Sequence, residues 1–115
     1  MNFLAVAFGG FIGSILRFSL SEFVKMKFLT TLAVNIIGSI LLAIFYVAFT
    51  LDYISENMWL FLGIGFCGAY TTFSTFSNES LQFLFAKRYF SALLYITSTL
   101  LLSIGGFYLT YRLLH

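Results

Sequence analysis

Charged side chains, proline, cysteine and histidine are scarce or absent in this chain of 115 residues. Six basic and four acidic side chains make up only 9% of the residues, whereas hydrophobic side chains make up 61% and the mean hydropathy is +1.01. Soluble domains carry about 25% charged residues. The composition therefore predicts a membrane protein, and the small net charge of +2 provides no footprint for nucleic acid binding.

The shortage of cysteine and histidine restricts the chemistry. Cys67 is the single cysteine, so no disulfide can form within the chain, and its apolar neighbours favour a packing role. The only histidine is the last residue, His115, which leaves no set of ligands for a zinc site and no serine, histidine and carboxylate set for nucleophilic catalysis. The sequence therefore argues against an enzyme.

Apolar runs of about the length that crosses a bilayer, roughly 20 residues, separate the charged positions. We expect four membrane spans, at about residues 2–20, 28–51, 57–83 and 89–111. Each lacks the alternating pattern of a lipid-facing strand, and a backbone in lipid must satisfy its own polar groups, so helices are expected. The connections are too short for a soluble domain. The sequence thus predicts one transmembrane domain over residues 1–115, all-α and multi-pass, in the plasma membrane.

The third span combines glycines with a cluster of hydroxyls in the run GFCGAYTTFSTFSNE, residues 65–79. The chain has no proline, so a helix break must come from glycine or from side chains that compete for backbone partners. Gly63, Gly65 and Gly68 precede Thr71, and we expect a break there, near the membrane centre. Broken helices at this depth occur where they line a cavity or are buried in protein, and their free carbonyls can hold a cation.

Polar side chains in two other spans repeat every four residues and therefore share a helical face. The second span carries Thr31, Asn35 and Ser39, and the fourth carries Tyr95, Thr99 and Ser103. Such groups either bond to their own or a neighbouring helix, or they serve transport. Both interpretations stay open, although the Asn35 amide has more donors and acceptors than a helix backbone can satisfy.

In the first span Gly9 and Gly13 form a G-x-x-x-G pair, which predicts a face that another helix can approach closely. Arg17 either extends its stem to the membrane interface or attracts anions toward a vestibule. In the third span Phe73 and Phe76 are three residues apart, so their ring edges could contact an anion. Because the chain has 16 phenylalanines, packing or lipid contact is the alternative.

Three runs resemble the Fluc, or CrcB-type, fluoride channels: residues 65–79, GGFIGSILRF at residues 9–18 and NIIGS at residues 35–39. The resemblance covers essentially the whole chain. It implies four transmembrane helices, the third broken near the membrane centre, in an antiparallel dual-topology dimer. It also implies passive, fluoride-selective export that lowers cytoplasmic fluoride, with a structural sodium ion at the centre.

The resemblance further implies roles for individual residues. Arg17 corresponds to a vestibule arginine and Glu79 to a carboxylate near the lower end of the third helix. The backbone carbonyls of Gly68 and Thr71 are expected to hold the sodium ion. The residues expected along the fluoride pathway are Asn35, Phe73, Phe76, Thr31, Ser74, Tyr95, Thr99 and Ser103.

Two functions of other classes remain open. A small multidrug-type exporter also has four helices, but it couples transport to protons through a carboxylate in its first helix, and residues 1–21 contain no Asp or Glu. A non-transporting membrane assembly subunit would use the polar stripes only for helix contacts.

The basic side chains are unevenly distributed over the two sides of the membrane. Dual insertion goes with little charge bias, and the positive-inside rule applied here predicts both termini outside. The expected partner is therefore either a second copy or an oppositely inserted homologue. One side carries Arg17, Lys25, Lys27, Lys87 and Arg88, and the other carries Arg112.

Overall fold

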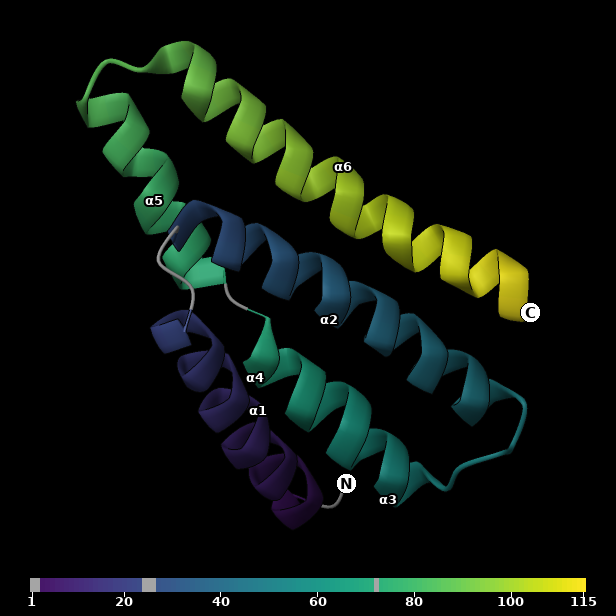
Figure 1. Cartoon of the computed structure of the whole chain (residues 1–115). Coiled ribbons are helices and arrows are strands. Elements are labelled where there is room, and N and C mark those ends of the chain that lie inside the picture. Colours follow the sequence, from purple (N-terminus) through teal and green to yellow (C-terminus); the bar gives the residue numbers. More distant parts are fainter. Residues whose placement is uncertain (1–2, 24–26, 72) are drawn as a thin grey trace.

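The computed structural model describes residues 3–23, 27–71 and 73–115, and for residues 27 and 73–75 it describes the backbone alone. Within these ranges the chain forms helices and no strand, so the expected all-α class is confirmed. The elements, shown in Figure 1, are α1 (Phe3–Phe23), α2 (Lys27–Thr50), α3 (Glu56–Trp59), the π-helix η1 (Leu60–Cys67), α4 (Gly68–Tyr70), α5 (Phe73–Phe85) and α6 (Tyr89–Leu114).

Three of the described helices are long and apolar enough to cross a membrane, namely Phe3–Phe23, Phe28–Thr50 and Tyr89–Leu114. They correspond to three of the four apolar spans of the sequence. The remaining span is divided among α3, η1, α4 and α5, the longest of which has 13 residues. The chain is a multi-pass, all-α membrane protein.

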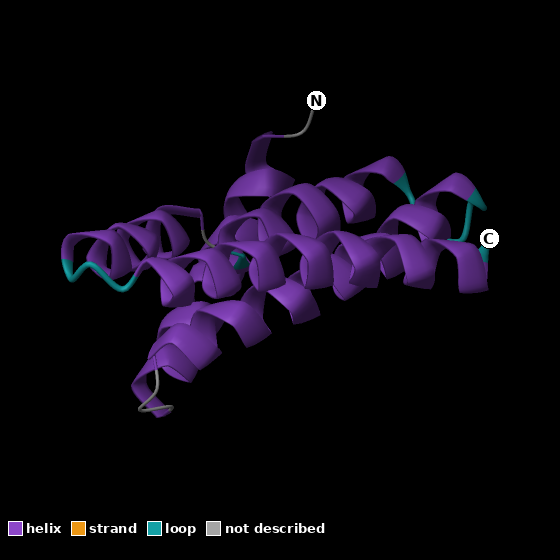
Figure 2. Cartoon of the chain, turned by 90° about the horizontal axis from the view of Figure 1, so that it is seen from above, coloured by secondary structure: helices purple, strands orange, loops and turns teal. Residues whose placement is uncertain are grey.

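The helices form an elongated bundle with extents of 48 × 29 × 24 Å. α2 and α6 pack along each other and run in the same direction, while α1 packs against η1 and α4 (Figure 1). The η1 segment also contacts α2, and α5 packs against the beginning of α6. The turn between α5 and α6 lies at one end of the bundle, whereas the C terminus lies at the opposite end (Figure 2). The groove described below lies between α2, η1 and α6.

The close approach of α1 to η1 depends on glycine. Gly9 and Gly13 are the buried residues of α1, and a Cβ at either position would overlap a backbone carbonyl oxygen of η1, that of Phe61 or of Phe66. From the opposite side, a Cβ at Gly65 would lie 2.5 Å from the carbonyl oxygen of Val6. The contact face predicted from the G-x-x-x-G pair is therefore confirmed, since backbone meets backbone here.

The connection after α2 ends that helix without glycine. Asp52 has a φ of 64°, and the N–H of Tyr53 donates to the carbonyl oxygen of Ala48 at 2.8 Å, which is the bond pattern of a Schellman turn. Ser55 then caps α3, because its Oγ accepts from the N–H of Met58 at 3.2 Å. These hydrogen bonds fix the backbone at the C-terminal end of α2 and at the beginning of α3.

The chain leaves the helical conformation between α4 and α5. α4 ends at Tyr70, and Thr71 has φ −74° and ψ 157°, an extended conformation. Both the N–H and the Oγ1 of Thr71 donate to the carbonyl oxygen of Cys67, at 3.0 and 2.9 Å. The hydroxyl thus competes for a helical carbonyl, as the sequence predicts for this hydroxyl-rich segment. A Cβ at Gly38 of α2 would overlap the Thr71 side chain, so α2 packs directly against this segment.

Candidate functional site

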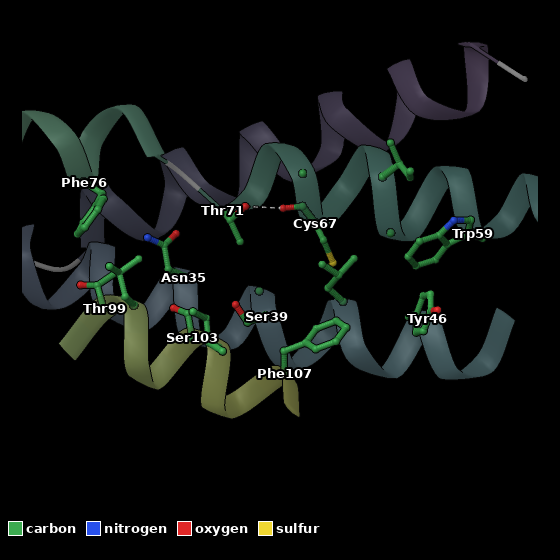
Figure 3. A pocket seen from close by; sticks show the side chains of 17 residues that line it. Asn35, Ser39, Tyr46, Trp59, Cys67, Thr71, Phe76, Thr99, Ser103 and Phe107 are labelled. Carbon is green, nitrogen blue, oxygen red and sulfur yellow. Dashed lines mark hydrogen bonds between the residues drawn. The ribbon is translucent and has the colours of Figure 1, made fainter. Parts of the chain in front are cut away.

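A groove of about 610 Å³ lies between α2, α6 and the η1–α4 segment (Figure 3). Its walls are mainly apolar. Asn35, Phe76 and Thr99 lie at one end of the groove, and Tyr46 and Trp59 lie at the other (Figure 3). The small polar side chains along the groove are Asn35, Ser39, Thr71, Thr99 and Ser103.

The two hydroxyls that α6 contributes lack partners. Thr99 Oγ1 and Ser103 Oγ are buried, and neither has a hydrogen-bond partner in the described part of the chain. Thr99 is only 3% exposed. A hydroxyl that leaves water without a compensating hydrogen bond costs on the order of 1–3 kcal/mol in proteins. Each of these hydroxyls can therefore donate a hydrogen bond to a small guest in the groove.

Phe76 provides an aromatic surface at the same end of the groove. Its ring is 7% exposed, and its centroid lies 5.4 Å from that of Tyr95 at an interplanar angle of 45°. The edge of such a ring is electropositive. Phe76 lies at the same end of the groove as Asn35 and Thr99, which carry polar hydrogens (Figure 3).

A buried carboxylate lies beside the groove. Glu79 of α5 is 5% exposed, and its two oxygens accept from different helices. Thr31 of α2 donates from Oγ1 to Oε1 at 2.7 Å, and Tyr95 of α6 donates from its hydroxyl to Oε2 at 3.2 Å. A buried carboxylate needs such donors because an unpaired charge away from water is costly. The cluster therefore ties α2, α5 and α6 together through hydrogen bonds.

The remaining predicted residues have different positions. Gly68 and Thr71 line the groove, and a Cβ at Gly68 would meet no atom within 4 Å. Arg17 is half-buried on α1, away from the groove, and its Nε is buried without a hydrogen-bond partner in the described ranges. The side chains of Phe73 and Ser74 lie outside the described residues.

Sequence reasoning missed two features of the site. It placed Thr31 and Tyr95 on polar helix faces but gave no sign that Glu79 is the acceptor for both. It also missed the aromatic end of the groove, where the Tyr46 and Trp59 rings meet edge to face at a centroid distance of 5.9 Å. These residues come from separate helices, so no local spacing signals their contact.

The small polar side chains of the groove carry hydroxyls and an amide. Within residues 3–23, 27–71 and 73–115, no group of three or more His, Cys, Asp or Glu side chains is placed to hold a metal ion. The hydroxyls and the amide lie in apolar surroundings. Donors of this kind can replace the hydration shell of a small anion.

Comparisons with known proteins agree on one family. A family model described as "CrcB-like protein, Camphor Resistance (CrcB)" matches residues 4–111. The chain is 42% identical over 110 residues to the fluoride-specific ion channel FluC of Phocaeicola vulgatus, covering 91% of each chain. It is 41% identical over 111 residues to the fluoride-specific ion channel FluC 1 of Methanosarcina acetivorans, covering 92% of this chain and 85% of the relative. It is 40% identical over 118 residues to the fluoride-specific ion channel FluC of Shewanella frigidimarina, covering 98% of this chain and 95% of the relative.

Proposed function

Because this chain belongs to the CrcB family, we infer that it is a fluoride-specific ion channel and not an enzyme. The family match is the observation that carries this conclusion, since relatives named as fluoride-specific channels align with nearly the whole chain. The groove supports it, because fluoride is a small, strongly hydrated anion that must find hydrogen-bond donors when it leaves water. In the plasma membrane, passive flow down the gradient lowers cytoplasmic fluoride.

We propose that fluoride passes along the end of the groove where Asn35, Phe76 and Thr99 meet. Support comes from the unpartnered hydroxyls of Thr99 and Ser103. Phe73 and Ser74 are the first two residues of α5, the helix that carries Phe76, and would also contribute. Thr31 and Tyr95 would contribute through the neighbouring Glu79 cluster, and Arg17 would attract anions to a vestibule.

We propose further that α3, η1, α4 and α5 together make a fourth membrane crossing, interrupted near the membrane centre. The extended backbone of Thr71 between two helical segments supports this proposal. Pairing with an antiparallel copy or an oppositely inserted homologue would add further walls to the groove. The single transmembrane domain would then contribute half of a dual-topology dimer.

A structural sodium ion would be held by the backbone carbonyls of Gly68 and Thr71. Hard cations prefer oxygen ligands, and carbonyls at a helix interruption are such ligands. The chain fits this role because the space next to Gly68 is open and Thr71 departs from the helix. A partner chain could therefore bring its own carbonyls to the same ion.

Fluoride efflux from liposomes tests the proposed function. Purified protein reconstituted into vesicles loaded with fluoride is expected to release it down the gradient, whereas vesicles loaded with chloride retain their anion. An ion-selective electrode follows the release, and empty liposomes serve as the control. Efflux that requires a proton gradient, or proton-driven uptake of a lipophilic cation, would indicate an exporter. Vesicles as tight as the empty ones would favour an assembly subunit.

Thr99→Val tests the pathway. Valine has nearly the shape of threonine, and the Thr99 hydroxyl has no partner to lose among the residues that the structure describes, so the fold should be unaffected. A hydrogen bond to a charged group contributes about 1.5–3 kcal/mol, so fluoride flux is expected to fall by roughly one to two orders of magnitude. Thr97→Val, on the exposed face of the same helix, is the matched control. Equal flux in the two variants would contradict a role for Thr99.

A further inference from the structure

The two ends of the bundle differ in charge. The connection between α2 and α3 carries Asp52 and Glu56, with Arg112 in the last turn of α6 at the same end. The turn between α5 and α6, residues 85–90, lies at the opposite end and carries Lys87 and Arg88, both exposed (Figures 1 and 2). The sequence has no Asp or Glu after Glu79, so residues 85–90 contain no carboxylate side chain of their own.

The backbone of the α5–α6 turn is held by a second Schellman arrangement. Lys87 has a φ of 60°. Its N–H donates to the carbonyl oxygen of Leu84 at 3.0 Å, and the N–H of Arg88 donates to the carbonyl oxygen of Phe83 at 2.9 Å. Glycine is the favoured residue at such a position because a side chain is strained there. A lysine at this position places an ammonium group on the turn, although the positive φ is an unfavourable backbone conformation for a residue with a side chain.

The guanidinium of Arg88 is held over an aromatic ring. Its Cζ lies 5.3 Å from the centroid of Phe83, whose ring is buried. This cation–π contact restrains the side chain at the beginning of α6. Lys87 and Arg88 therefore present two adjacent cations. Hydrogen bonds restrain the backbone of their turn, and the contact with Phe83 restrains the Arg88 side chain.

Large apolar side chains flank these cations. Phe85 is 81% exposed, Phe90 is 73% exposed and Tyr89 between them is 63% exposed. Phenyl rings next to Lys and Arg at a helix end match the layers of a membrane interface, in which rings enter the acyl region and cations stay at the phosphates. Anionic lipids attract basic side chains at this level.

We propose that residues 85–90 bind the headgroups of anionic phospholipids. Lys87 and Arg88 contact the lipid phosphate, while Phe85 and Phe90 insert beside the acyl chains. A turn that carries basic side chains is suited to the membrane–water interface, where anionic headgroups lie. The binding is independent of ion conduction, because none of these residues lines the groove.

Lipid retention measured by native mass spectrometry tests this site. The full-length protein is released from detergent after incubation with phosphatidylglycerol or with phosphatidylcholine of the same acyl chains, and wild type is expected to retain more of the anionic lipid. One Lys or Arg near an anionic surface corresponds to about a fivefold change in binding, so the double variant Lys87→Gly with Arg88→Gln should lose this preference. Glycine suits the turn geometry at residue 87, which keeps the fold intact.

Three controls make the result decisive. Lys87→Arg keeps the charge and should keep the preference, and Arg112→Gln, at the other end of the bundle, should also keep it. An unchanged preference in the double variant, or an equal loss in Arg112→Gln, would overturn the proposal. Displacement of the lipid by glycerol 3-phosphate at equal concentration would also overturn it, because it would indicate a site for a soluble phosphate without the apolar contacts. Circular dichroism verifies that each variant is folded.

Discussion

Asn35→Asp is expected to lower fluoride flux by about a thousandfold. The change replaces the amide donors with a group that accepts and carries negative charge, at the end of the groove where Phe76 and Thr99 also lie. Two unit charges about 4 Å apart repel by roughly 4 kcal/mol at an effective dielectric constant of about 20, which corresponds to this factor. A protonated aspartic acid would offer one O–H donor in place of the two N–H donors of the amide. Fluoride efflux from liposomes measures the rate.

Asn57→Asp is the matched control for this change. Asn57 lies on α3, is exposed and does not line the groove. The added carboxylate is in the first turn of that helix, where negative charge is favourable, so flux should stay near the wild-type rate. Similar fluoride fluxes for the two variants would contradict the assignment of Asn35 to the fluoride pathway. If Asn35→Asp lost fluoride flux because it unfolded, the elution profile of the purified protein in gel filtration would reveal it.

Gly9→Ala is expected to destabilise the protein by on the order of 3 kcal/mol, the upper part of the usual range for overpacking. The new methyl group would overlap the carbonyl oxygen of Phe61 and approach the N–H nitrogen of Phe66 to 2.9 Å. Both atoms belong to the backbone of η1, so no side chain can rotate out of the way. The helices α1 and η1 must therefore move apart. The midpoint of thermal unfolding in detergent measures the loss.

Gly105→Ala carries the same change on α6 and should behave oppositely. A Cβ at Gly105 would meet no atom within 4 Å. Alanine in a helix is favoured over glycine by about 0.5–1 kcal/mol, so the unfolding midpoint should stay the same or rise slightly. If the two alanine variants unfolded at the same temperature, the close contact between α1 and η1 would not be the source of stability at Gly9.

Much of the architecture could be predicted because hydropathy depends only on the residues of one segment. Three apolar spans of the sequence are continuous helices in the structure. The pair Gly9 and Gly13 also predicted a close helix contact, since a small surface is a property of one helix. The partner helix could not be predicted in the same way, because any apolar helix fits a glycine face.

The polar stripes show where prediction from sequence ended. Thr31 and Asn35 share one face of α2 by their spacing, yet Thr31 donates to Glu79 and Asn35 lines the groove. On α6, Tyr95 also donates to Glu79, whereas the hydroxyl of Thr99 has no partner in the described residues. Whether a residue bonds to Glu79 or lines the groove depends on which other helix lies opposite it. That neighbour comes from a segment far away in the sequence, so the spacing within one helix does not reveal it.

The order of the residues alone is enough to predict that the chain lies in a membrane, that it is helical and which residues are polar within its spans. These properties follow from local hydropathy and helical periodicity. The helix packing was needed to show that Glu79 accepts hydrogen bonds from two other helices, and that the hydroxyls of Thr99 and Ser103 have no partner among the described residues. The reason is that a hydrogen bond between helices requires atoms about 3 Å apart, and close packing between helices, such as that of the Thr71 side chain against Gly38, sets those distances.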